Sequence, residues 1–84
     1  MELHHVRAFL AVAEELHFGR AAQRLHMAQP PLSRTIKQLE RHLGCPLFER
    51  TTRTVRLTPQ GEALLAPAHE IVRSFEQAER AVAF

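Results

Sequence analysis

The first hydrophobic pattern begins at the start of the chain, where apolar residues recur at steps of three and four: Leu3, Val6, Phe9, Leu10, Ala13 and Leu16. This spacing places apolar side chains on one side of a helix, so it predicts an amphipathic helix over residues 3–15. The next segment contains Ala21 and Ala22, which have strong helix propensity and allow another helix to approach closely. It predicts a second, short helix over residues 18–25.

A second apolar stripe follows Pro30 and Pro31, which open a third helix because prolines are tolerated in a first turn. The stripe consists of Leu32, Ile36, Leu39 and Leu43, and Gly44 is expected to end the helix. A different face, about 140° wide at 100° per residue, has no acidic residue. It carries Gln29, Pro30, Ser33, Arg34 and Lys37.

Two short segments after the third helix favour strands. Residues 47–50 and 55–57 flank a threonine-rich connection, and four threonines lie between positions 51 and 58. Threonine is β-branched and favours strands. We predict a two-stranded hairpin, although its tip lacks the Gly or Asn typical of tight turns.

The last apolar stripe follows Thr58 and Pro59, which suit an N-cap and a first helical position. Its members follow steps of three and four, as in a coiled-coil heptad: Gly61, Leu64, Ala68, Ile71, Phe75, Ala78 and Val82. The pattern predicts a helix of roughly 39 Å over residues 59–84, with dimerisation through Leu64, Ala68, Ile71, Phe75, Ala78 and Val82. Pro67 is expected to bend this helix or to leave the Ala63 carbonyl without its hydrogen bond. The alternative is a helix that packs back on its own domain.

The net charge of +2 conceals an uneven distribution. Residues 17–58 hold eight basic residues against two acidic ones, a net charge of +6, whereas residues 1–16 and 59–84 each carry −2. Seven of these eight basic residues are arginine, which suits two-point contacts with phosphate and guanine. A solvated charged surface would give the same total, so the positions of the basic residues must decide between the two interpretations.

The composition argues against an enzyme. The chain of 84 residues suits one small domain, and it has no Asp, no Gly-rich loop and no nucleophile–base pair at a motif spacing. The six histidines are scattered, so we expect no metal and no cofactor. Cys45 is the only cysteine, which excludes an internal disulfide and fits the reducing cytoplasm. The longest apolar run, residues 8–13, is too short for a membrane span or a signal peptide, so no membrane partner is expected.

The order of the elements indicates DNA binding. A helix, a short helix, a tight turn and a third helix with a polar, basic face form a helix-turn-helix, and the basic hairpin makes the winged form. A helix fits the major groove of double-stranded DNA, where Gln29 can contact adenine, Arg34 guanine and Ser33 a base edge. Arg53 at the hairpin tip can reach a minor groove. The alternative is a helical protein-interaction module whose basic face binds an acidic partner protein.

Over essentially its whole length, the chain resembles the N-terminal DNA-binding region of LysR-type bacterial transcriptional regulators. The most specific segment is Gln29-Pro30-Pro31-Leu32-Ser33-Arg34, followed by Ile36, Leu39-Glu40 and Leu43-Gly44. The remaining matches are Leu3 and Phe9 to Glu14, Phe18, Ala21-Ala22 and Leu25-His26, Leu47 to Arg50, Arg53, Leu57 to Pro59, and Gly61.

The resemblance implies a winged helix-turn-helix over residues 1–58 and a linker helix over residues 59–84 that dimerises antiparallel with its mate. In that family the residues matching Gln29, Pro30, Ser33 and Arg34 approach the major groove, and the residue matching Arg53 approaches the minor groove. We therefore expect a homodimer (a tetramer when full length) on an inverted repeat. Members usually continue into an effector-binding domain, which we expect this chain to lack, so a small-molecule inducer would bind only through that domain.

The expected DNA-binding residues are Gln29, Pro30, Pro31, Ser33, Arg34, Lys37, Arg53, Arg20 and Arg50. Arg20 and Arg24 can be either phosphate contacts or ion-pair partners. The chain departs from many relatives, which have Ser where it has His17, at the expected N-cap of the second helix, and Ser where it has Ala28. A missing cap costs about 0.5–2 kcal/mol, so the sequence leaves the starts of these two helices open.

Overall fold

The computed structural model describes residues 1–83 and contains four helices and one hairpin. The elements are α1 (Leu3–Glu15), α2 (Phe18–Arg24), α3 (Gln29–Leu43), β1 (Phe48–Arg50), β2 (Val55–Leu57) and α4 (Pro59–Ala81). The predicted fold class is confirmed: three helices, a two-stranded wing and a long last helix. The first helix and the second strand have the predicted bounds, and the other elements with predicted bounds differ from them by one to three residues at one end. Phe84 lies outside the described residues.

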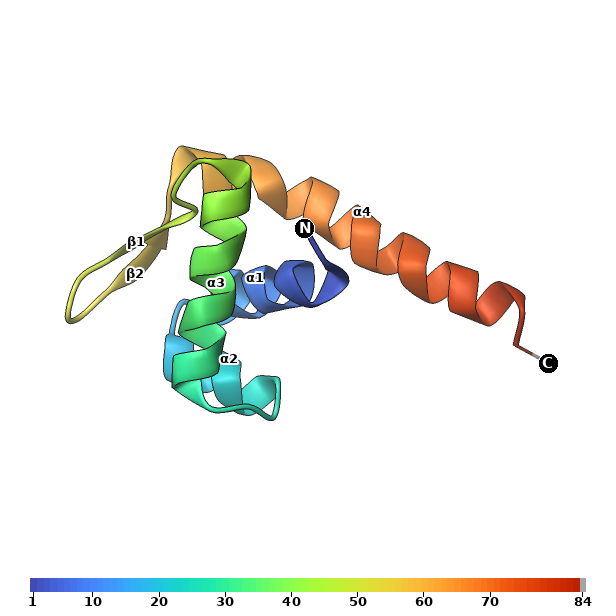
Figure 1. The fold of residues 1–84 in the computed structure, drawn as a ribbon, viewed down its shortest axis with the longest axis horizontal. Helices are drawn as coiled ribbons and strands as arrows, with labels where there is room; N and C mark the ends of the chain where they lie inside the picture. Colours follow the sequence, from blue (N-terminus) through green and yellow to red (C-terminus); the bar gives the residue numbers. More distant parts are fainter. Residues whose placement is uncertain (84) are drawn as a thin grey trace.

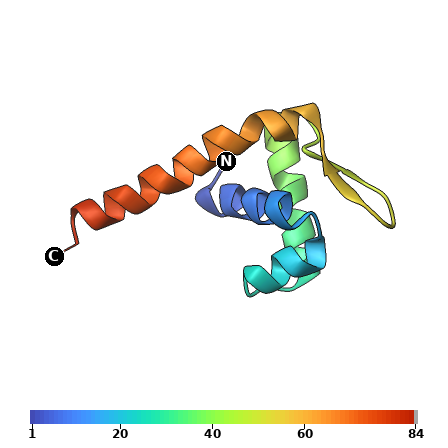
Figure 2. The ribbon, with the colours of Figure 1, turned by 180° about the vertical axis from the view of Figure 1, so that it is seen from behind.

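α1 is the centre of the domain, with α2, α3 and α4 packed around it (Figures 1 and 2). Seven of its thirteen residues are buried, including the whole run of residues 8–13. Phe9 and Val12 are fully buried together with Leu32 and Leu39 of α3. Because helices cover α1 on several sides, a continuous apolar run suits it better than a single stripe.

α2 begins with a histidine cap. His17 Nδ1 accepts a hydrogen bond from the Arg20 backbone N–H at 2.9 Å, so the imidazole satisfies a donor that a serine would otherwise serve. The ring occupies the space beside residue 19, where a Cβ would lie 2.8 Å from His17 Cε1, and glycine avoids that clash. α3 has no side-chain cap at Ala28, but the prolines in its first turn reduce the number of free N–H groups.

The C-terminal end of α3 differs from the prediction at one residue. Gly44 adopts the left-handed conformation at φ 77° and ends the helix as expected. Leu43, however, is 39% exposed, so the buried stripe of α3 ends at Leu39. The periodicity continues to Leu43, but residues 41–43 of the last turn are all exposed.

The Leu47 peptide joins α3, the wing and α4. Its N–H donates to the Glu40 carboxylate at 2.7 Å, and its carbonyl accepts from the Thr58 N–H at 3.0 Å. The Thr58 hydroxyl donates to the Pro46 carbonyl at 2.7 Å and accepts from the Gly61 N–H at 3.0 Å, which caps α4. These bonds satisfy the buried polar groups where three elements meet.

The wing is an antiparallel hairpin in which Phe48 pairs with Leu57 and Arg50 with Val55. Its turn uses threonine in place of the expected Gly or Asn. The Thr51 hydroxyl accepts from the backbone N–H groups of Arg53 and Thr54 at 3.2 and 3.0 Å, and the Thr51 N–H donates to the Thr54 carbonyl at 2.9 Å. Side-chain bonds of this kind stabilise a turn without a residue at positive φ.

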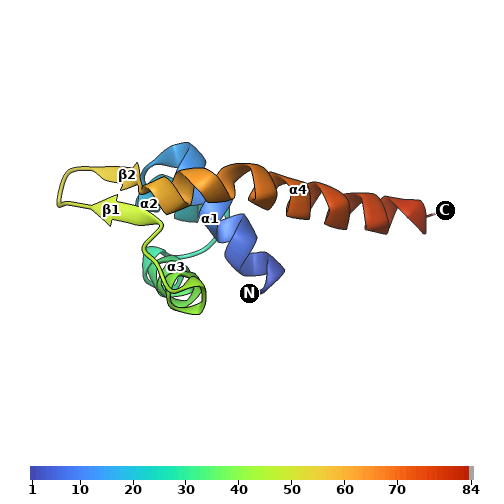
Figure 3. The ribbon, with the colours of Figure 1, turned by 90° about the horizontal axis from the view of Figure 1, so that it is seen from above.

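α4 packs along α1 over its first half and then projects away from the domain, opposite to the wing (Figures 1 and 3). Ala68 is fully buried and Leu64 packs against the same core, so these two residues face their own domain. This corrects the prediction that the dimerisation seam includes them. Ile71, Phe75, Ala78 and Val82 are exposed, and the helix is continuous through Pro67.

Polar contacts from α1 support the departing part of α4. Arg7 Nη1 lies 3.8 Å from Glu76 Oε2, and its guanidinium carbon lies 5.9 Å from the centre of the Phe75 ring. His69 Nε2 lies 3.6 Å from Glu14 Oε2. Exposed ion pairs are individually weak, so these contacts orient α4 more than they stabilise the fold.

Gly61→Ala tests the junction at Leu47. A Cβ at this position would collide with the Leu47 carbonyl oxygen and lie 2.8 Å from Leu57 Cδ2. Because backbone must move to admit it, we expect the free energy of unfolding to fall by about 2 kcal/mol. Chemical denaturation measures this loss, and Gln60→Ala at the neighbouring exposed position should change stability by less than about 0.5 kcal/mol. Equal stability of Gly61→Ala and the parent chain would contradict the close packing.

His17→Ala and His17→Ser test the histidine cap. Alanine removes the acceptor for the Arg20 N–H, so thermal unfolding should show a loss of about 1 kcal/mol. Serine supplies a hydroxyl acceptor and should retain most of the stability. If alanine and serine proved equally stable, the His17 side chain would not be capping α2.

Candidate nucleic-acid interface

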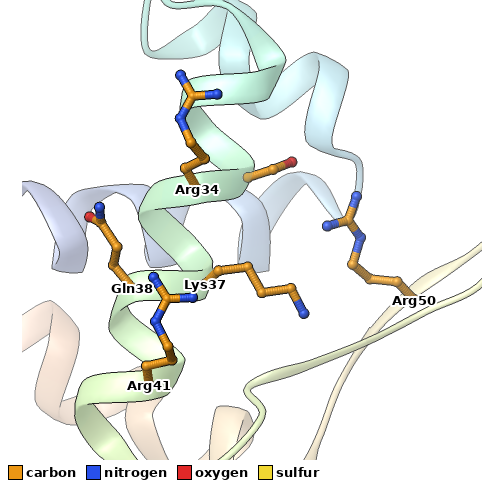
Figure 4. Close-up of a pocket in the computed structure, with 6 residues that line it drawn as sticks. Arg34, Lys37, Gln38, Arg41 and Arg50 are labelled. Carbon is orange, nitrogen blue, oxygen red and sulfur yellow. The ribbon is translucent and has the colours of Figure 1, made fainter.

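The exposed face of α3 and the adjacent end of β1 form a shallow basic groove of about 390 Å³ (Figure 4). α3 presents Arg34, Lys37, Gln38 and Arg41 to it, and Arg50 reaches in from the wing (Figure 4). Ser33 completes the lining. The groove combines four cationic side chains with two neutral hydrogen-bonding ones and has no carboxylate in its lining, so it suits a polyanion.

A second groove, also of about 390 Å³, lies between the start of α2 and the hairpin. Gln29, at the start of α3, and Arg53, in the hairpin turn, both line it. Arg50 lines both grooves. The fold thus brings Gln29, Ser33, Arg34, Lys37, Arg50 and Arg53 to neighbouring parts of one surface.

Ion pairing separates the basic residues into two groups. Arg34, Arg41, Arg50 and Arg53 make no salt bridge within residues 1–83, and all four lie on α3 or the wing. Lys37 Nζ lies 3.8 Å from Glu40 Oε1, while the other oxygen of that carboxylate accepts from the Leu47 N–H. The positive charge of α3 and the wing is therefore largely free to meet an external anion.

The arginines of α2 are paired internally. Arg24 contacts the carboxylates of both Glu14 and Glu15, and hydrogen bonding to Glu14 raises the pKa of Arg24. Arg20 Nε lies 3.6 Å from the Glu15 carboxylate, and Arg20 Nη2 donates to the Glu15 carbonyl at 3.1 Å. Of the two roles left open for this pair, the structure shows the ion-pair arrangement. It places Arg20 beside the end of α1, outside the linings of both grooves.

The two prolines take different positions in the first turn of α3. Pro30 is exposed, whereas Pro31 is half-buried and its carbonyl accepts from the Thr35 hydroxyl at 3.0 Å. Pro30 can therefore approach a ligand from the end of the helix, while Pro31 mainly shapes the first turn.

Sequence reasoning missed three residues of this surface. Gln38 and Arg41 continue the exposed face of α3 at helical spacing from Arg34, a signal that was present in the sequence. Phe18 lies under Arg50, whose guanidinium carbon is 3.8 Å from the ring centre. No periodicity links Phe18 to Arg50, because the two residues belong to α2 and β1.

Within residues 1–83, no group of three or more His, Cys, Asp or Glu side chains could hold a metal ion. In the same part of the chain, no helix is both long and apolar enough to cross a membrane.

Comparisons with known proteins identify the family. Residues 3–62 match the family of bacterial regulatory helix-turn-helix proteins of the lysR type. The transcriptional regulator AlsR of Bacillus subtilis is 62% identical over 65 residues, covering 77% of this chain and 22% of AlsR. The chain spans about a quarter of the length of the curated relatives it matches first.

Solved structures of DNA complexes share the fold. The BenM DNA-binding domain with catB site 1 DNA superposes with a TM-score of 0.92 at 44% identity, covering 96% of this chain and 90% of that one. The CbnR DNA-binding domain–DNA complex gives a TM-score of 0.87 at 39% identity, covering 99% and 100% of the two chains. The winged helix-turn-helix described above therefore has the fold of these DNA-binding domains, and the matched family is one of transcriptional regulators, not of enzymes. The chain belongs to the LysR family of bacterial regulatory helix-turn-helix proteins.

Proposed function

We propose that this chain binds double-stranded DNA sequence-specifically, with α3 in a major groove and the hairpin turn in the neighbouring minor groove. Gln29, Ser33 and Arg34 read base edges, whereas Lys37 and Arg50 contact phosphates. Pro30 and Pro31 shape the leading turn of α3, and Arg53 enters the minor groove. Arg20 can join only by giving up its contacts with Glu15.

The observation that carries this proposal is the distribution of ion pairs. Carboxylates neutralise the arginines of α2, whereas Arg34, Arg41, Arg50 and Arg53 stay free on one surface. A merely solvated charged face would not concentrate its unpaired cations along one helix and the adjoining wing. The relatives BenM and CbnR, crystallised as DNA complexes, support DNA over an acidic protein as the partner.

We further propose that two copies associate through the exposed part of α4. Ile71, Phe75 and Val82 are 37, 43 and 73% exposed, and with Ala78 they form an apolar stripe beyond the domain. Two antiparallel α4 helices would cover each other's stripes and set the distance between two α3 helices. The dimer would then bind an inverted repeat, with the wings at its flanks.

Regulation by a small molecule would depend on an effector domain. A longer protein of this family would add an effector domain, which would take a small-molecule inducer and could assemble the dimers into a tetramer. DNA binding also implies a cytoplasmic location in a bacterium.

Arg34→Ala tests base reading by α3. Duplexes selected from a random library provide a preferred sequence, and a scrambled version provides the reference. We expect the substitution to cost about 1–3 kcal/mol of binding free energy on the preferred duplex and to remove the preference at one base pair. Fluorescence anisotropy over a range of salt concentrations measures both affinities. The logarithm of the association constant should fall linearly with the logarithm of the salt concentration, with a slope of about −0.9 per phosphate contacted.

Arg80→Ala is the matched control for Arg34→Ala. It removes the same charge near the far end of α4, and it should leave the preference between the two duplexes unchanged. If Arg34→Ala lost the same binding free energy on both duplexes, Arg34 would have no role in base reading. Absence of duplex binding at low salt and dimer-forming concentration would refute the DNA proposal itself.

Ile71→Asp tests dimerisation. A carboxylate at Ile71, the first residue of the exposed stripe, would have to be buried against the apolar stripe of a second copy, so we expect sedimentation to shift toward the monomer. Gln77→Asp adds the same charge on another face of α4 and should leave the dimer intact. An unchanged dimer in Ile71→Asp would show that this stripe is not the interface.

A further inference from the structure

Arg50 differs from the other unpaired arginines because an aromatic ring supports it. Its guanidinium carbon lies 3.8 Å from the centre of the Phe18 ring, within the range of a cation–π contact. Arg50 is exposed at the end of β1, whereas Phe18 at the start of α2 is only 4% exposed. The contact joins a surface cation of the wing to a ring anchored in the core.

Other aromatic rings of the core hold the Phe18 ring in place. It meets Phe48 edge to face, with the ring centres 6.2 Å apart and the planes at 71°. Phe48 in turn lies 5.5 Å from Phe9, one of the fully buried residues of α1. Three rings from α1, α2 and β1 therefore form a rigid base beneath the guanidinium.

The position of Arg50 indicates what this cluster of three rings does. Arg50 lines both the groove beside α3 and the groove beside the hairpin turn, and it makes no salt bridge within the described chain. A free arginine loses much of its rotamer freedom when it binds a phosphate. A ring that covers one face of the guanidinium orders the side chain beforehand and leaves its N–H edge available.

We propose that Phe18 is a positioning residue for DNA binding: its ring holds Arg50 where the two grooves meet, ready to bind one backbone phosphate of the duplex. The inference rests on the proposed function above. Phe18 itself touches no DNA in this arrangement. It acts only through the order that it imposes on Arg50.

The first test requires no DNA. In NMR spectra the Arg50 side-chain protons should be shifted upfield by the Phe18 ring current. Phe18→Tyr keeps the ring and should keep the shift, whereas Phe18→Leu keeps apolar bulk and should abolish it. An Arg50 spectrum that is the same in Phe18→Leu and in the parent chain would overturn the proposal.

The second test is a double-mutant cycle with a random-sequence duplex at low salt as the probe. We expect Phe18→Leu to weaken binding about threefold in the parent chain and not at all in the Arg50→Ala background. Phe18→Tyr should bind like the parent. The control cycle pairs Phe18→Leu with Arg53→Ala, and here the two losses should multiply, because Arg53 does not stack on Phe18.

The outcomes separate this inference from the function on which it rests. If Phe18→Leu lowered the DNA affinity equally in the parent and in the Arg50→Ala background, the positioning role would be overturned and DNA binding would stand. Absence of binding by the parent chain would overturn both. Denaturation curves show whether Phe18→Leu is folded, and if it is not, Phe18→Met replaces it with the same expectations.

Discussion

The peptide of Leu47 is the constraint on which the arrangement of this domain depends. Its N–H is bound by Glu40 of α3, and its carbonyl is bound by Thr58 at the start of α4. The close approach of Gly61 to the same carbonyl leaves no room for a side chain. Because α3, the wing and α4 meet at this one buried point, none of them can rotate without breaking its hydrogen bonds. The geometry of the basic surface thus follows from a junction on its inner side.

Internal contacts also determine which charges stay free on the surface. Glu40 serves the junction with one carboxylate oxygen and lies near Lys37 with the other, so this acidic residue of α3 is turned inward and away from the basic groove. Glu14 and Glu15 engage the arginines of α2. On the wing, Glu49 pairs with Arg56 at 3.4 Å, so the charges that stay unpaired on α3 and the wing within residues 1–83 are all positive. Segregation of this kind attracts a polyanion at long range, before any specific contact forms.

Much of the fold could be predicted from the chain alone, since the apolar stripe of α3, the Thr58-Pro59 start of α4 and the Gly44 stop each have a local physical cause. The misses also have causes. The sequence leaves the start of α2 open at His17, where an imidazole nitrogen accepts the hydrogen bond of a serine cap because Gly19 makes room for the ring. Leu43 continued the period of α3 but has nothing to cover it. The face of α3 that forms the candidate site was predictable from its spacing up to Lys37, and the same spacing extends to Arg41.

The sequence by itself determined which segments are helical and that the basic residues gather in the middle of the chain, because these properties depend on neighbours within a few positions. Tertiary structure alone decided how these features are used. One apolar stripe of α4 became two surfaces, with Ala68 buried in its own domain and Phe75 left exposed, because α1 is long enough to cover only the first part of α4. Ion pairs with Glu14 and Glu15 likewise distinguish the arginines of α2 from those of α3. The fold also places Phe18 under Arg50. Such contacts join elements distant in sequence, and no local pattern encodes the distance between them.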